Sequence, residues 1–321
     1  MNRALLCASQ LLALLIATSA LASAAVAQPR VPSLQERLGY PANARLLVIH
    51  ADDFGMAHSV DRAISQALEN GWVTSASVMV PCPWFPEVAA WARKHPNADL
   101  GIHLVLDSEW SGYRWGPVAP ADKVSSLLDP DGYFFDDPSL FVRVKMSEVE
   151  TELRAQIDKA HAERMHITHL DSHMIALSTT RHLFEVYQRL GHDYDLPIAL
   201  VRNGSYRMPG GVVPPADALA LDDVITMDPG VSKSGWLGWY EKNLAALKPG
   251  VYQLIVHLAY DDDEFRGATS GHPDWGAAWR QQDLDMVSSP EFRQFLRDQK
   301  FILVNWGQLS KAYTSRVHAT Y

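Results

Sequence analysis

Cysteine is almost absent from this 321-residue chain, which contains only Cys7 and Cys82. Cys7 lies in an N-terminal stretch that we expect to be removed, so the mature chain has one cysteine and no intrachain disulfide. A domain of about 290 residues buries enough apolar surface to fold without such cross-links. We therefore expect Cys82 to be a small, buried apolar side chain.

Basic stripes, internal repeats and low-complexity linkers are also lacking. The net charge is −9, with acidic and basic residues mixed along the chain. This pattern argues against nucleic acid as a partner, because nucleic-acid binding relies on clustered Lys and Arg. No segment after the N-terminal stretch is long and apolar enough to span a bilayer, so we expect no stable membrane association. Aromatic residues are plentiful, and rings exposed in loops suit either a sugar-binding cleft or a protein interface.

The N-terminus has the pattern of a secretory signal peptide. Arg3 provides a positive n-region, Leu5 to Leu21 is an apolar stretch, and Ala25-Val26-Ala27 is a small-residue cleavage signal. The alternative is a membrane anchor, but the apolar stretch is short and Ala-rich. We expect residues 1–27 to be cleaved, residues 28–321 to form one domain, and the protein to be secreted or periplasmic.

From Arg45 onward, strand-like runs alternate with helical patterns. Expected strands are 46–51, 75–80, 100–106, 167–170, 198–201, 224–226, 252–256 and 302–304, and expected helices are 58–70, 86–94, 147–164, 179–190, 237–247 and 290–299. This alternation predicts an α/β fold, most simply a distorted (β/α) barrel of seven or eight strands; an open doubly wound sheet is the alternative. The long connections 107–146 and 258–281 follow predicted strands, so we place both on the catalytic rim.

The most informative stretch is Leu46–Gly55, where a buried-type strand ends in two adjacent carboxylates, Asp52 and Asp53. A buried strand does not tolerate two such charges without compensation, and a metal ion would supply it. Adjacent residues of an extended strand point to opposite sides. One carboxylate could therefore hold a metal while the other takes a proton from water.

Histidines end three other predicted strands and converge with the carboxylates on one face of a barrel. They are His103 in Gly-Ile-His-Leu, His169 and His173 on either side of Asp171, and His257 after Leu-Ile-Val. One carboxylate and two histidines suit a catalytic divalent cation. His173 is better placed than His169, which would lie behind the ligands.

The remaining polar residues at strand ends have supporting roles. Asp171 would orient a ligand imidazole, and His257 would act as a general acid. Arg202, after the 198–201 strand, would pair with a site carboxylate or hold substrate oxygens, although a surface salt bridge is the alternative.

Five segments carry a family resemblance: His-Ala-Asp-Asp-Phe-Gly-Met (50–56), Gly-Ile-His-Leu (101–104), Thr-His-Leu-Asp-Ser-His-Met (168–174), Ile-Ala-Leu-Val-Arg (198–202) and Leu-Ile-Val-His (254–257). In this order they resemble the carbohydrate deacetylases of the YdjC-like group. The resemblance implies a distorted barrel that holds one divalent metal and removes an acetyl group from an N-acetylated sugar. By this resemblance Asp53, His103 and His173 are the metal ligands.

The resemblance also implies that Asp52 is the general base, His257 the general acid or transition-state partner, and Arg202 the arginine that supports the site. The chain departs from the family pattern in three places. His50 stands where the family often has Asn, Ile175 where it often has a second His, and Leu258-Ala259 where it often has Pro-Gly.

These observations predict metal-dependent hydrolysis of an acetamido sugar or oligosaccharide. Zn²⁺ and Mg²⁺ are the foremost candidates for the metal, and Mn²⁺ or Fe²⁺ remain open. The alternatives are a metal-dependent hydrolase of another ester or phosphoester, a glycosidase, or a non-catalytic exported carbohydrate-binding protein. The oligomeric state stays open, with a homodimer as one option.

Overall fold

The computed structural model describes residues 31–136, 143–204, 206 and 213–313. The described residues from Pro32 onward form one compact unit, and the expected signal peptide at residues 1–27 lies outside the described residues. None of the described helices combines the length and the apolar character that a bilayer crossing requires.

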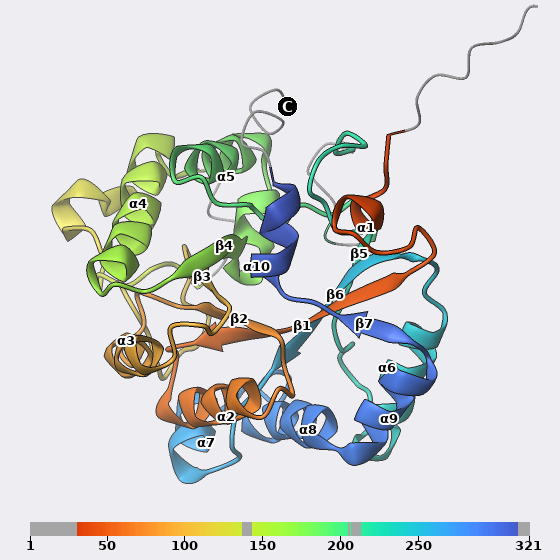
Figure 1. Cartoon of the computed structure of the whole chain (residues 1–321). Coiled ribbons are helices and arrows are strands. Elements are labelled where there is room, and N and C mark those ends of the chain that lie inside the picture. The colour runs from red at the N-terminus through yellow and green to blue at the C-terminus, as the bar shows by residue number, and fades with distance from the viewer. Residues whose placement is uncertain (1–30, 137–142, 205, 207–212, 314–321) are drawn as a thin grey trace, which may run out of the picture. The chain divides into compact units, whose positions relative to one another are not determined.

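Seven parallel strands form the central sheet (Figure 1). They are β1 (Arg45–Phe54), β2 (Ser75–Val78), β3 (Leu100–Leu104), β4 (Ile167–Ser172), β5 (Asp223–Ile225), β6 (Gly250–His257) and β7 (Phe301–Leu303). Their order is β4-β3-β2-β1-β6-β5, with β7 paired to β1. Strand pairing does not close this path, although isolated parallel bridges join Leu170 to Ile198 and Val201 to Leu221.

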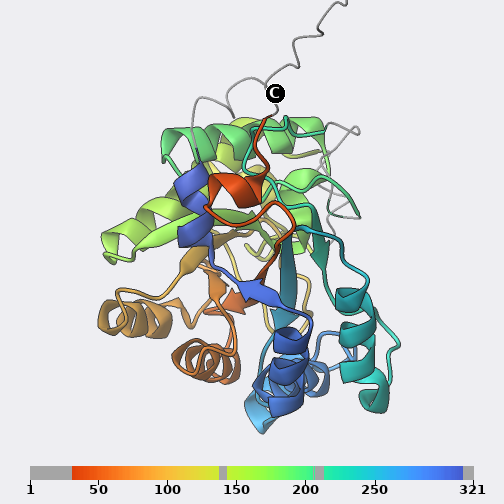
Figure 2. The same ribbon diagram turned by 45° about the vertical axis from the view of Figure 1, so that its right-hand side comes forward.

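Ten α-helices are present among the described residues. They are α1 (Leu34–Arg37), α2 (His58–Glu69), α3 (Phe85–Lys94), α4 (Met146–Ala162), α5 (Arg181–Asp193), α6 (Trp236–Ala245), α7 (Asp263–Ala268), α8 (Ala277–Ser288), α9 (Pro290–Asp298) and α10 (Trp306–Leu309). Figures 1 and 2 show α2 and α3 following β1 and β2, as expected when parallel strands are joined by helical crossovers.

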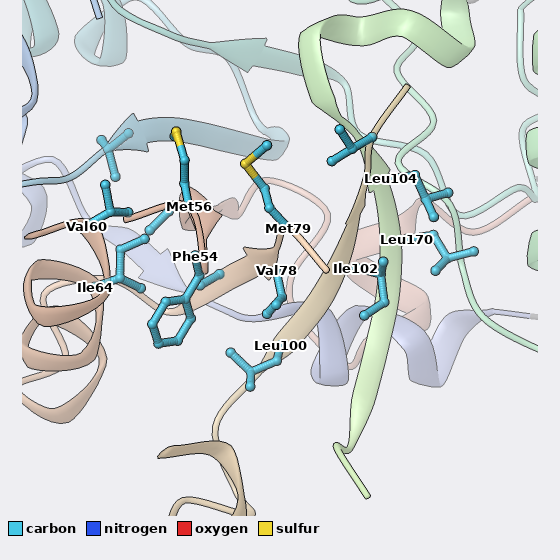
Figure 3. Packing of buried hydrophobic residues seen from close by; sticks show 14 of the residues in the cluster. Phe54, Met56, Val60, Ile64, Val78, Met79, Leu100, Ile102, Leu104 and Leu170 are labelled. Atoms are coloured by element: carbon cyan, nitrogen blue, oxygen red, sulfur yellow. The ribbon is translucent and has the colours of Figure 1, made fainter. Parts of the chain in front are cut away.

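Strand β1 is buried on both faces and divides the core in two. Leu47 and Ile49 belong to the larger apolar cluster, whereas Leu46 and Val48 belong to a smaller one that includes Trp306 of α10. Figure 3 shows part of the larger cluster, where Phe54 of β1 lies close to Ile64 of α2. Such a strand reads as a continuous apolar run because each face meets apolar neighbours.

The predicted parallel α/β architecture is confirmed, with two local corrections. The expected strand 198–201 is reduced to the two bridges. The expected connection 258–281 contains α7 and the first turn of α8, whose apolar residues lie too irregularly for a helical pattern to be read from the sequence. Cys82 is buried, as predicted.

Candidate metal centre

The inner face of β1 changes from apolar to polar towards its carboxyl end. Leu46 and Val48 lie in the smaller core cluster. Alternate residues of a strand share a face, so the next side chains on this face are His50 and Asp52, which are both buried. Strand β6 pairs with β1 in register and brings His257 opposite Asp52. The carboxyl ends of these parallel strands therefore gather polar side chains above an apolar base.

Asp53 breaks the alternation of β1. Its φ of 74° lies in the left-handed region, which a non-glycine residue adopts rarely, and the pairing of β1 with β2 shifts register between Ala51 and Phe54. As a result both carboxylates approach the same imidazole: Asp53 Oδ1 lies 3.4 Å and Asp52 Oδ2 3.9 Å from His103 Nε2. The expectation that adjacent residues would face opposite sides is wrong here, because it assumed extended backbone at Asp53.

Asp53, His103 and His173 form a compact donor set. Asp53 Oδ1 is 3.4 Å from His103 Nε2 and 3.4 Å from His173 Nδ1, and these two nitrogens are 3.3 Å apart. All three residues are buried, and Asp53 Oδ1 has no hydrogen-bond partner within the part of the chain that the structure describes. A buried carboxylate oxygen without a partner, facing two imidazole nitrogens, fits a divalent cation.

Asp171 holds two histidines at once. Its Oδ1 accepts a hydrogen bond from His103 Nδ1 at 2.8 Å, and its Oδ2 accepts one from His50 Nε2 at 3.0 Å. Burial alone would raise the pKa of Asp171, but His103 and His50 lower it below its ordinary value. Burial likewise opposes the charge on His103, yet Asp171 and Asp52 raise the pKa of His103 to about 9. Asp171 thus orients His103 with Nε2 towards Asp53.

Asp52 and His257 line a pocket of about 90 Å³ beside the donor set, together with Ile175, Tyr206 and Ile255 among others. Asp52 Oδ2 lies 3.9 Å from His257 Nε2. Burial raises the pKa of Asp52 to about 6, and burial lowers the pKa of His257 to about 3. Asp52 is therefore a carboxylate of raised basicity, and His257 is a neutral imidazole near pH 7.

Helix α8 supplies two functional residues that the sequence did not indicate. Arg280 donates to Asp53 Oδ2 at 2.6 Å. Asp283, one turn later, accepts from the backbone N–H of His257 at 2.9 Å and from Trp236 and Tyr240. Burial would raise the pKa of Asp53, but Arg280 and His173 hold it well below its usual range. Arg280 lies 227 residues from Asp53 in a stretch predicted as a loop, so no sequence signal linked them.

The loop after β3 supplies two more unpredicted acids. Glu109 Oε2 lies 3.2 Å from His173 Nε2. Asp107 is fully buried, and it, Glu109 and His173 each place a polar atom within 4.8 Å of the others. Burial lowers the pKa of His173, but Glu109 and Asp107 outweigh it and hold that pKa well above its ordinary value.

Two predicted residues lie away from the donor set. Arg202 donates to the backbone oxygens of Pro214, Pro215 and Ala218, so the arginine at the site carboxylates is Arg280 instead. Arg202 follows the isolated bridge at Val201, and its side chain turns to the 214–218 segment.

His169 lies deeper in the molecule than the donor set. Its ring stacks on Trp306 at 4.8 Å and lies 5.1 Å from the ring of His50, and it also lies near Asp171, so it packs behind the donor set. Burial lowers the pKa of His169 well below its ordinary value, which keeps the ring neutral.

Gly101 makes room for this buried ring, which leads to a stability prediction. A Cβ at Gly101 would lie 2.4 Å from the His169 ring, so we expect Gly101→Ala to lower the free energy of unfolding by about 1–3 kcal/mol. Urea titration would measure the loss. Gly112→Ala is the matched control, because nothing lies within 4 Å of its Cβ position. Equal stability of the two variants would contradict the expected clash.

The family model of YdjC-like proteins matches residues 46–298, most of the chain and all of the donor set. The chain belongs to the YdjC-like family. A relative from Thermus thermophilus, named carbohydrate deacetylase, is 36% identical over 87% of this chain and 98% of its own length. A second relative, also named carbohydrate deacetylase, comes from Thermoanaerobacter pseudethanolicus and is 28% identical over 83% of this chain and 99% of its own length.

A solved structure shares the fold of this chain. A protein from Enterococcus faecalis V583 aligns with a TM-score of 0.68 and 24% identity, covering 83% of this chain and 99% of the other. At this identity the likeness concerns the fold alone, and the chemistry of this YdjC-like protein rests on its own site residues.

Proposed function

We propose that this protein is a metal-dependent carbohydrate deacetylase that cleaves the amide bond of an N-acetylated sugar or oligosaccharide. The observation that carries the proposal is Asp53 Oδ1, a buried oxygen without a hydrogen-bond partner among the described residues, which faces His103 Nε2 and His173 Nδ1. The names of the related proteins support a carbohydrate substrate.

Asp53, His103 and His173 would hold the cation. Two imidazoles and one carboxylate suit Zn²⁺, and Mg²⁺ is the other leading candidate. When bound, such a cation would polarise the acetyl carbonyl and lower the pKa of a water molecule. Arg280 keeps Asp53 ionised and occupies Oδ2, which leaves Oδ1 free for the cation.

Asp52 would act as the general base. It lines the pocket beside the donor set. Its pKa, raised to about 6, makes it a better proton acceptor than an ordinary carboxylate and is still low enough to leave it mostly ionised at neutral pH. Water then forms a bond to the acetyl carbon, the C–N bond breaks, and the proton held by Asp52 becomes available to the departing amine. The products are acetate and a free amino sugar.

His257 would contact the reacting groups from beside Asp52, on the neighbouring strand β6. Since its pKa is lowered to about 3, it is neutral before the reaction. It can therefore donate a hydrogen bond, or relay the proton from Asp52, whose Oδ2 is 3.9 Å from Nε2. His257 would therefore not start the reaction as a charged imidazolium that gives up its own proton. It would instead pass on the proton that Asp52 has taken from water.

The test is acetate release from N-acetylated oligosaccharides before and after treatment with a chelator. We expect the chelated protein to lose turnover and to regain it when Zn²⁺ or Mg²⁺ is added back. Acetate release at the full rate by protein shown to be metal-free would contradict the mechanism. Phosphate release or glycan cleavage instead of acetate would identify a different hydrolase.

We also propose that the protein acts after export, because residues 1–27 have the charge, apolar stretch and cleavage signal of a secretory signal peptide. N-terminal sequencing of the protein from its native cells should begin at Gln28. A mature protein that starts at Met1 would contradict this.

A further inference from the structure

The two imidazoles of the candidate metal centre face it through different nitrogens. His103 presents Nε2, because its Nδ1 is bound to Asp171 at 2.8 Å. His173 presents Nδ1, which lies 3.4 Å from Asp53 Oδ1, and its Nε2 lies 3.2 Å from Glu109 Oε2. A ring nitrogen that carries a hydrogen cannot bind a cation, so the acceptor at the far nitrogen decides which nitrogen is free.

The loop that carries Glu109 is held firmly. Gln156 of α4 hydrogen-bonds both the N–H and the carbonyl of Val105, at 3.0 and 2.8 Å. Trp115 Nε1 donates to the carbonyl of Asp107 at 2.8 Å, and Ser108 Oγ accepts from the backbone of Trp115 at 3.1 Å. Glu109 thus approaches His173 from a backbone fixed on both sides of it.

From these contacts we infer that Glu109 is a positioning residue that holds the Nε2–H of His173 and so directs Nδ1 towards a bound cation. The inference rests on the proposed metal-dependent function and adds a residue to it. Carboxylates bound to ligand histidines fix the orientation of the ring, and losing one typically weakens metal affinity 10–100-fold.

Asp107 provides a matched control. It is fully buried, both of its oxygens lack a hydrogen-bond partner among the described residues, and it belongs to the same group as Glu109 and His173. Removal of its charge therefore alters the same electrostatic field without removing the acceptor that lies 3.2 Å from His173 Nε2.

The experiment measures Zn²⁺ dissociation constants by chelator competition. We expect Glu109→Ala to weaken binding about 10–100-fold. Glu109→Gln should retain most of the affinity, because its amide oxygen still accepts from Nε2–H, and Asp107→Asn should leave the affinity nearly unchanged. Nitrogen NMR of Zn²⁺-loaded, ¹⁵N-histidine-labelled protein should show His173 protonated at Nε2 in the wild type and in Glu109→Gln, and a mixture in Glu109→Ala.

Unchanged affinity and an unchanged NMR pattern in Glu109→Ala would overturn the inference. So would equal losses in Glu109→Gln, Glu109→Ala and Asp107→Asn, since that result would reflect charge alone. The proposed function fails separately: a wild-type protein that binds Zn²⁺ but releases no acetate refutes deacetylation and leaves the role of Glu109 to be decided by affinity and NMR.

Discussion

An Asp52→Asn protein is expected to bind its metal normally and to turn over substrate about 10²–10⁴ times more slowly. Asp52 Oδ2 is 3.9 Å from His103 Nε2 and 3.9 Å from His257 Nε2. It therefore borders the donor set but lies farther from His103 Nε2 than Asp53 Oδ1 does, at 3.4 Å. The amide of Asn fills the same volume but cannot accept the proton from water. Steady-state kinetics and metal titration on the same preparation would separate these effects.

The neighbouring carboxylate should give the opposite pattern. We expect Asp53→Asn to lose metal affinity as well as activity, because Asp53 Oδ1 lies 3.4 Å from both imidazole nitrogens. Asn is the suitable replacement since it tolerates the left-handed backbone at this position, where φ is 74°. If Asp52→Asn also lost its metal, or if Asp53→Asn kept it, the division of roles between the two acids would be wrong.

The site residues that could be predicted are polar side chains that directly follow an apolar strand pattern. Asp52, Asp53, His103 and His257 follow apolar runs that end at the carboxyl edge of a parallel sheet. That edge gathers polar groups from distant segments, so their proximity follows from the fold class. The sequence thus indicated the α/β architecture and the strand ends that carry the candidate donors, whereas the choice of Asp53, His103 and His173 among them came from the family resemblance and stays a prediction.

The parts that could not be predicted depend on side-chain direction or on long loops. Arg202 follows a predicted strand and Arg280 lies in a predicted connection, so the sequence favoured Arg202, yet Arg280 contacts Asp53 whereas Arg202 binds backbone oxygens. Glu109 lies in a connection without periodicity, so neither its position nor its contact with His173 could be foreseen. The left-handed backbone of Asp53 was also hidden, because strand patterns assume extended residues.

The contact between Arg280 and Asp53 is a buried ion pair, with side chains 3% and 2% exposed. Removing one partner of such a pair leaves an uncompensated charge. We therefore expect Arg280→Met to lower the free energy of unfolding of the metal-free protein by about 3–5 kcal/mol, measured by urea titration. An exposed arginine serves as control: Arg266 pairs with Asp261 at 2.7 Å but is 58% exposed, so Arg266→Met should lower the free energy of unfolding far less than Arg280→Met does.

A double variant shows whether the stranded charge is the cause. Arg280 also donates to the carbonyl of Trp275 at 2.7 Å and lies 5.5 Å from the ring of Trp110, so part of its contribution is packing. If the loss in Arg280→Met comes mainly from an unpaired Asp53, then adding Asp53→Asn should recover much of it, because a neutral amide has no charge to compensate. Additive losses in the double variant would mean that packing dominates, and that Asp53 does not depend on Arg280 for its ionised state.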